Sequence, residues 1–137
     1  MQEILERLVD RVIHAPIDPA PSDNIYMENV FDPAIYQQIL TRLPEDDIYQ
    51  FIDHPDAKLP DGTRTRKLLD LTDASINRIK KEDQAFWQMI RTVMTSELLQ
   101  RVIVQKFHAK LRHRFGNHVP ELVTVPIFYR DLPGYYI

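Results

Sequence analysis

Residues 123–137, VTVPIFYRDLPGYYI, are the run richest in β-forming residues and constrain the fold of the chain most. Apolar side chains occupy every second position from Val123 to Tyr129, which predicts a strand with these side chains on one face. Residues 131–134 then predict a turn, because proline presets one backbone angle and glycine tolerates a positive φ. Residues 135–137 would begin a second strand. Since a single hairpin is marginal in water, the run predicts the opening of a larger sheet.

Composition places the chain among ordinary globular proteins. Its 137 residues, 44% of them hydrophobic, are sized for a single domain over residues 1–137. The net charge of −3 does not indicate a nucleic-acid or membrane-surface protein. The chain has no cysteine, and its charged N-terminal residues lack the apolar core of a signal peptide. We therefore expect a cytoplasmic protein with no nucleic-acid partner and no membrane association.

Apolar residues recur at helical spacing in four segments. The first, Gln2–His14, is followed by three prolines that predict an extended connector. The second covers residues 33–43, with Asp32 as the capping acid and Pro44 as the stop. We expect its buried face to comprise Ile35, Tyr36, Ile39, Leu40 and Leu43.

The two remaining helices are predicted over residues 81–95 and 97–115. Ser96 is placed to cap the start of the last helix, and Gly116 follows its end as a C-terminal cap. The apolar ladder of this helix steps by four residues throughout. It consists of Leu99, Ile103, Phe107, Leu111 and Phe115.

Two further strands are predicted, one short strand over residues 24–30 and one exposed strand over residues 63–69. Residues 45–62 are polar and contain two prolines and a glycine, which is typical of a loop. Helices thus precede most of the strands. This order predicts an α+β fold in which helices pack on a sheet.

Histidine and carboxylate pairs are the first candidates for chemistry. His54 and Asp56 form the chain's His-x-Asp pair, which with a distant second histidine can bind non-haem Fe(II). Their polar, proline-rich surroundings favour a solvated loop instead. His108 and His113 are five residues apart on one predicted helix, so they do not share a face as a metal pair would. Asp10 and His14 have the spacing of an ordinary ion pair on a helix.

The segment from residue 98 to residue 120 contains no acidic residue. This segment could bind phosphate or an acidic partner, or it could be the solvated face of the last helix. Its cationic residues are Arg101, Lys106, Lys110, Arg112 and Arg114. The chain has three glycines, none of them clustered, and no G-x-S-x-G motif, which leaves no recognisable phosphate loop or nucleophile motif.

Residues 126–137, PIFYRDLPGYYI, resemble the strand, turn and strand that lead into the metal site of Fe(II)/2-oxoglutarate-dependent dioxygenases, in particular their prolyl-hydroxylase-like branch. Arg130, Pro133 and Gly134 match that pattern. Residues 24–44, NIYMENVFDPAIYQQILTRLP, resemble the strand and first helix of these proteins. The later helices resemble those that support the barrel.

The resemblance implies a double-stranded β-helix, or jelly roll, of which this chain forms an incomplete N-terminal part. It implies Fe(II) and 2-oxoglutarate as cofactors of the complete protein, which would hydroxylate a small-molecule or protein substrate. The metal-binding His-x-Asp would follow residue 137, so we expect no catalytic or metal-binding residue, no bound cofactor and no activity in this chain alone. The expected cofactor-binding residues are Tyr129, Arg130, Tyr135 and Tyr136.

A non-enzymatic interaction domain is the alternative function. The C-terminal strand would then pair with a partner or with a second copy of the chain, because unpaired backbone groups of a strand favour such pairing. An uncovered apolar face on the sheet would also promote a homo-oligomer.

Overall fold

The computed structural model describes residues 1–119, 121 and 123–132 and is a mixture of helix and sheet, in agreement with the predicted α+β class. The chain divides into two compact units. The helical unit contains Met1–Arg42 and Met89–Thr124, and the sheet unit contains Leu43–Gln88 and Val125–Ile137. Within the described part of the chain, no helix has the length and apolar character needed to cross a membrane.

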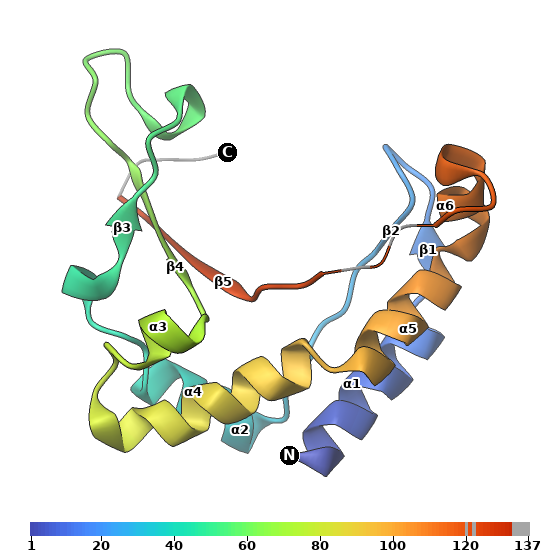
Figure 1. Ribbon diagram of the computed structural model, residues 1–137, viewed down its shortest axis with the longest axis horizontal. Helices are drawn as coiled ribbons and strands as arrows, with labels where there is room; N and C mark the ends of the chain where they lie inside the picture. The colour runs from blue at the N-terminus through green and yellow to red at the C-terminus, as the bar shows by residue number, and fades with distance from the viewer. Residues whose placement is uncertain (120, 122, 133–137) are drawn as a thin grey trace. The chain divides into compact units, whose positions relative to one another are not determined.

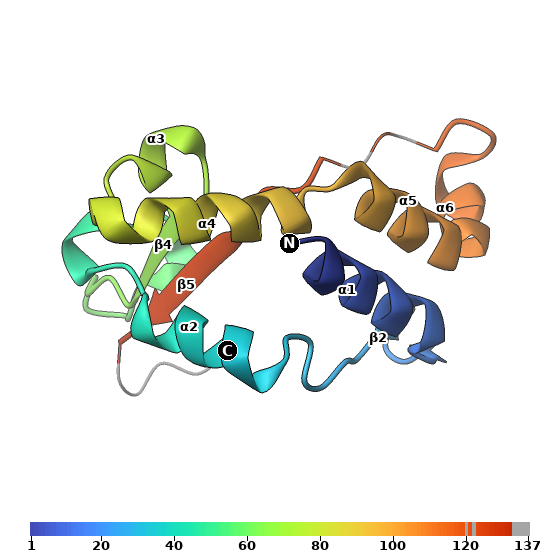
Figure 2. The ribbon, with the colours of Figure 1, turned by 90° about the horizontal axis from the view of Figure 1, so that it is seen from below.

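The helical unit is built around α1 and α5, which lie side by side (Figures 1 and 2). Its elements are α1 (Gln2–His14), β1 (Ile17–Asp18), β2 (Asn24–Ile25), α2 (Pro33–Thr41), the end of α4 (Lys81–Met94), α5 (Glu97–Lys106) and α6 (His108–Phe115). Ile4, Leu8 and Val12 recur every four residues and form one buried stripe on α1. The stripe packs with Val93 of α4 and Leu99 of α5 into one apolar core. The prediction of this first helix is confirmed.

Helix α2 begins as predicted but does not bury the predicted face. The Asp32 carboxylate accepts hydrogen bonds from the N–H groups of Ala34 and Ile35 at 2.9 and 3.0 Å. The side chains of Tyr36, Leu40 and Leu43 are nevertheless 51%, 43% and 49% exposed, so this part of the prediction is wrong. The physical reason is that α1, α4 and α5 already enclose the core, and α2 reaches it through Ile35.

The helix predicted over residues 97–115 is two helices. Phe107 has φ −99° and ψ 15°, which ends α5 and starts α6 in a changed direction (Figure 1). The Ser96 hydroxyl accepts a hydrogen bond from Leu99 N–H at 3.3 Å, and Gly116 has a positive φ of 67° at the C-terminal cap. Both caps are therefore confirmed. No proline or glycine lies at Phe107 to indicate the break. The apolar ladder continues through it, so the sequence predicts a single helix.

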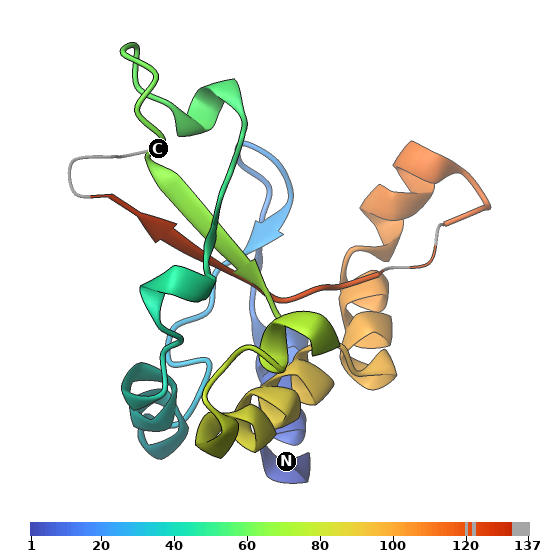
Figure 3. The same cartoon turned by 60° about the vertical axis from the view of Figure 1, so that its left-hand side comes forward.

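The sheet unit contains an antiparallel sheet in the order β3-β4-β5 (Figures 1 and 3). Its elements are the short helices at Asp46–Ile48 and Pro55–Ala57, β3 (Gln50–Phe51), β4 (Arg66–Asp70), α3 (Asp73–Ile76), the start of α4, and β5 (Ile127–Asp131). The strand predicted over residues 63–69 is therefore correct in kind. It is not exposed, because β4 is the central strand and Leu69 is buried.

Two other strand predictions need correction in their extent. The strand predicted over residues 24–30 covers Asn24–Ile25, after which Met27 and Val30 turn toward the core of the helical unit and Asn29 adopts a positive φ of 50°. The strand predicted from residue 123 begins at residue 127. The turn predicted at residues 131–134 and the strand predicted at residues 135–137 include positions outside the described residues.

The face of β5 that was predicted to be buried is the exposed one, and the other face packs on the core. Phe128 packs edge-to-face on Trp87 of α4, with ring centroids 5.0 Å apart. Val123, Ile127 and Tyr129 are instead 84%, 42% and 57% exposed. Alternate residues of a strand point to opposite faces, so seating Phe128 on a buried tryptophan turns its neighbours outward. Aromatic packing on α4, rather than the apolar alternation, sets the orientation of β5.

We predict that Phe128→Ala destabilises the protein by about 3 kcal/mol, because it leaves a cavity beside Trp87. The neighbouring Tyr129→Ala removes an exposed ring and should cost less than about 1 kcal/mol. Urea denaturation of the two variants and the wild type measures both values. A larger loss of stability in Tyr129→Ala than in Phe128→Ala would show that the other face of β5 packs against the core.

Candidate functional site

Two of the cofactor-binding residues expected from the family resemblance, Tyr129 and Arg130, lie in the described part of the chain. They are neighbours in β5. Consecutive strand residues point to opposite faces of a sheet, so their side chains do not line a common surface. Tyr135 and Tyr136 lie outside the described residues. Within the described part of the chain, the two faces of β5 are therefore separate candidates and have different chemistry.

Tyr129 lies on the exposed face, directly opposite Leu68 of β4. The Arg66 guanidinium stands over its ring, 5.4 Å from the centroid, and also forms a two-point ion pair with Asp131. In this pair the Arg66 Nη2 to Asp131 Oδ2 distance is 2.9 Å. The hydrogen bonds from Arg66 lower the pKa of the Asp131 carboxyl, against a smaller opposing effect of burial. The Arg66 guanidinium thus covers one side of the tyrosine ring, while the residue as a whole stays 57% exposed.

Farther along the same face, Asp70 of β4 lies directly opposite Ile127. The Asp70 carboxylate accepts a hydrogen bond from Ser75 Oγ at 2.6 Å, and Thr72 caps the start of α3 beside it. A cavity of about 260 Å³ adjoins this group and is also lined by Arg78. Because Thr72, Ser75 and Asp70 satisfy one another's hydrogen bonds, the group fixes the turn between β4 and α3 and offers no activated nucleophile.

Arg130 lies on the other face, where it forms an ion pair with Asp46 at 3.2 Å. Lys67 of β4 reaches the same carboxylate at 2.6 Å and stands 4.8 Å from the centroid of the Phe51 ring. The hydrogen bond from Lys67, together with the charge of Arg130, lowers the pKa of Asp46. Burial raises the pKa of the nearby Tyr49 hydroxyl. These contacts connect β4 and β5 to the segment before β3 and engage Arg130 with a carboxylate of its own chain.

Sequence reasoning missed Arg66 and Asp131, the pair that supports Tyr129. They are 65 positions apart in the chain and meet because β4 and β5 pair in antiparallel register. Backbone hydrogen bonds extend this register at both ends, from Leu71 N–H to Pro126 O at 2.9 Å and from Leu132 N–H to Thr65 O at 2.8 Å. The one usable signal was the alternation of basic and apolar residues in β4, which predicts a strand but not its partner.

His54 and Asp56 sit at the surface, with side chains 62% and 90% exposed. The His54 Nδ1 accepts a hydrogen bond from Asp56 N–H at 3.3 Å, which caps the short helix at Pro55–Ala57. In the described residues, no three His, Cys, Asp or Glu side chains come together as metal ligands. Asp10 and His14 form the expected helix pair at 3.1 Å. His108 and His113 are exposed on α6.

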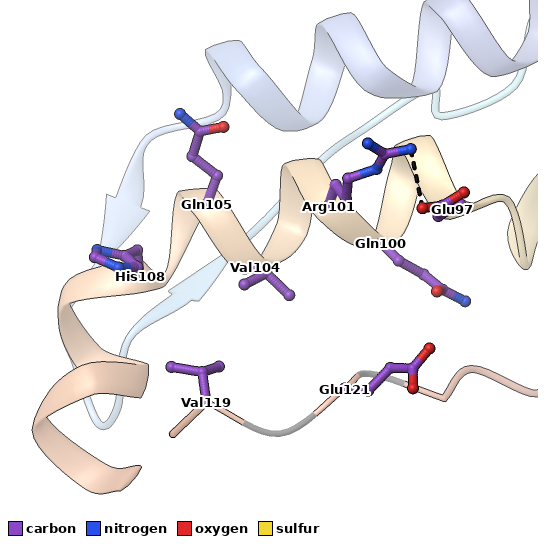
Figure 4. Close-up of a pocket in the computed structure, with 8 residues that line it drawn as sticks. All are labelled: Glu97, Gln100, Arg101, Val104, Gln105, His108, Val119 and Glu121. Carbon is purple, nitrogen blue, oxygen red and sulfur yellow. Dashed lines mark ion pairs between the residues drawn. The ribbon is translucent and has the colours of Figure 1, made fainter. Parts of the chain in front are cut away.

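A groove of about 830 Å³ lies between α5 and the segment that follows α6 (Figure 4). Val104 and Val119 provide its apolar walls, and Glu97 and Arg101 pair with each other at its margin at 3.0 Å. This pair compensates the charge of Arg101, and the other carboxylate that lines the groove among the described residues is Glu121. We place no site in this groove.

The lowered pKa of Asp131 predicts a loss of stability in acid. A carboxylate whose folded pKa lies below its unfolded value stabilises the protein above the unfolded pKa, and this contribution is lost as pH falls through the folded pKa. The free energy of unfolding should therefore fall between about pH 5 and pH 2, around the ordinary aspartate pKa of about 3.9. Asp131→Asn should make this dependence less steep in urea titrations, with the remainder due to other carboxyls of lowered pKa such as Asp46, whereas the exposed-site control Asp47→Asn should leave it unchanged. Equal slopes for both variants would refute the assignment.

Comparisons with known proteins add no relative to these observations, since no family model, no curated protein and no solved structure matches the chain.

Proposed function

We propose that the chain is the N-terminal part of an Fe(II)/2-oxoglutarate-dependent oxygenase, with its sheet as the beginning of a double-stranded β-helix. The observation that carries the proposal is the position of β5. This strand forms one edge of the described sheet, is supported from behind by Trp87, and carries an exposed Tyr129 just before the turn sequence that resembles the family's approach to its metal site.

Tyr129 is the described residue that best fits a cofactor-binding role. Its phenol is exposed on the open face of the sheet, and Arg66 holds the ring in place. A phenolic hydroxyl can donate a hydrogen bond to a carboxylate of 2-oxoglutarate. Arg130 fits a positioning role, because its pair with Asp46 fixes β5 from the opposite face. Tyr135 and Tyr136 stay in the proposal as further candidates on the basis of the resemblance.

The described residues do not themselves fit an iron site, since no three potential ligands among them converge. The resemblance, not this absence, is the reason why the proposal assigns iron binding to residues after position 137, and no step through the metal is derived from the described residues. When bound, iron and 2-oxoglutarate would supply the oxygen activation needed for hydroxylation. What this chain contributes is a wall of the site, made of β4 and β5, and the helix that supports it. The substrate class is a small molecule or a protein.

A second candidate function is partner binding through the outer edge of β5. The backbone bonds at Pro126 and Leu132 point toward β4, so in an antiparallel ladder the N–H groups of Ile127 and Tyr129 point to the other edge. No described strand pairs with that edge. N–H groups that no described strand pairs with, beside exposed apolar side chains, favour the addition of a strand from a partner or a second copy.

The oxygenase proposal predicts that the complete natural protein forms succinate from 2-oxoglutarate when supplied with Fe(II) and oxygen. Tyr129→Phe removes one hydrogen bond to a charged cosubstrate and should raise the KM for 2-oxoglutarate about tenfold. Tyr26→Phe is the matched control, since Tyr26 is 76% exposed in the helical unit, and it should leave the KM unchanged. Succinate formation, measured by mass spectrometry, gives the KM for the wild type and for both variants.

The 137-residue chain alone should form no succinate under the same conditions, and succinate formation by it would contradict the expected inactivity. A complete protein that forms none, with or without a hydroxylation substrate, would count against the oxygenase proposal itself.

The partner-binding candidate predicts self-association that depends on the edge of β5. Ile127→Pro removes an outward N–H without removing a bond to β4, so it should convert an associating chain to monomer in analytical ultracentrifugation. Ile127→Thr keeps the N–H and should still associate. A wild-type chain that is monomeric at all concentrations would exclude pairing between copies.

A further inference from the structure

Helix α6 carries a concentration of positive charge that the proposed oxygenase function does not use. Among its eight residues, HAKLRHRF, are three cationic side chains and two histidines, and none is acidic. The chain as a whole has a net charge of −3. The basic character is therefore local to α6 and not a general property of the surface.

A groove of about 570 Å³ lies between this helix and residues 22–23 of the β1–β2 connection. Phe107 and Leu111 are half buried and form its apolar floor. Lys110, His113 and Arg114 line its cationic side. All of these residues belong to the helical unit, so the groove is formed within one compact body.

The positive charge along the groove is only weakly compensated. Among the described residues, Asp23 is the one carboxylate that lines it, and its distance of 3.7 Å to Lys110 is long for an ion pair. The Arg114 guanidinium stands 5.3 Å from the centroid of the Phe115 ring, and among the described residues no carboxylate pairs with it. In contrast, Arg130 and Lys67 of the sheet unit both contact Asp46.

We propose that this groove binds a short acidic segment of another protein, in which an apolar side chain stands between carboxylates. The apolar floor would bury the apolar side chain, and Lys110, His113 and Arg114 would bind the flanking carboxylates. Charge complementarity with the cationic rim is the feature that selects an acidic partner.

A nucleic-acid backbone fits the groove less well. An eight-residue helix is about 12 Å long, which spans few phosphates, and high affinity for a polynucleotide requires many phosphate contacts. This proposal does not depend on oxygenase chemistry.

The test is fluorescence anisotropy with the 137-residue chain and a short fluorescein-labelled peptide in which glutamates flank two leucines. We expect saturable binding, weakened about tenfold by each of Lys110→Glu and Arg114→Glu, because each reversal replaces an attraction by a repulsion. Arg112→Glu is the matched control. It makes the same charge change on the same helix, but Arg112 donates a hydrogen bond to Asn117 at 2.8 Å instead of lining the groove.

Circular dichroism melting of each variant separates loss of binding from loss of folding, since all three substituted residues are exposed. Backbone amide NMR shifts on peptide addition should concentrate at residues 22–23 and 107–115. Equal weakening by Arg112→Glu, shifts located elsewhere, or absence of binding to the wild-type chain would overturn the proposal. Binding of a labelled oligouridine in preference to the acidic peptide would overturn it as well, and would indicate a nucleic-acid surface.

Discussion

The edge-to-face contact between Trp87 and Phe128 is the interaction on which the sheet unit depends most. Trp87 is fully buried and also meets Phe86 edge-to-face, with ring centroids 5.2 Å apart. Phe128 lies 41 positions after Trp87 in the sequence, so this contact joins α4 to a distant part of the chain in β5. Once Phe128 is seated, the two-residue period of a strand determines where its neighbours point. The packing of Phe128 on Trp87 therefore leaves Tyr129 exposed and directs Arg130 to the face where it pairs with Asp46.

The sequence correctly predicted those helices and caps that are determined by residues close to one another in the chain. The stripe on α1 and the caps at Asp32, Ser96 and Gly116 depend on residues within one or two helical turns, and the structure confirms them. The face of β5 depends on a tryptophan in another element, and apolar alternation alone selects the wrong side. The break at Phe107 has the same character, since the residue types around it would also suit a continuous helix.

The residues of the candidate site were also only partly predictable from local sequence patterns. The resemblance named Tyr129 and Arg130 as cofactor-binding residues, but consecutive residues of a strand point to opposite faces, so their side chains are separated. The residues that support Tyr129, Arg66 and Asp131, meet through the antiparallel register of β4 and β5, which no local pattern encodes. Sequence reasoning therefore found one member of the exposed surface of β5 and could not find the ion pair beside it.

Charge pairing distinguishes the two regions of the chain where an anion could bind. In the sheet unit, Arg66 is committed to Asp131, and Arg130 and Lys67 share Asp46. A ligand carboxylate there would have to displace an existing ion pair, and the gain would be small. On α6, Arg114 has an aromatic neighbour rather than a carboxylate among the described residues. The positive charge of Arg114 could therefore attract an anion without displacing an existing ion pair, which supports the proposed acidic partner on α6.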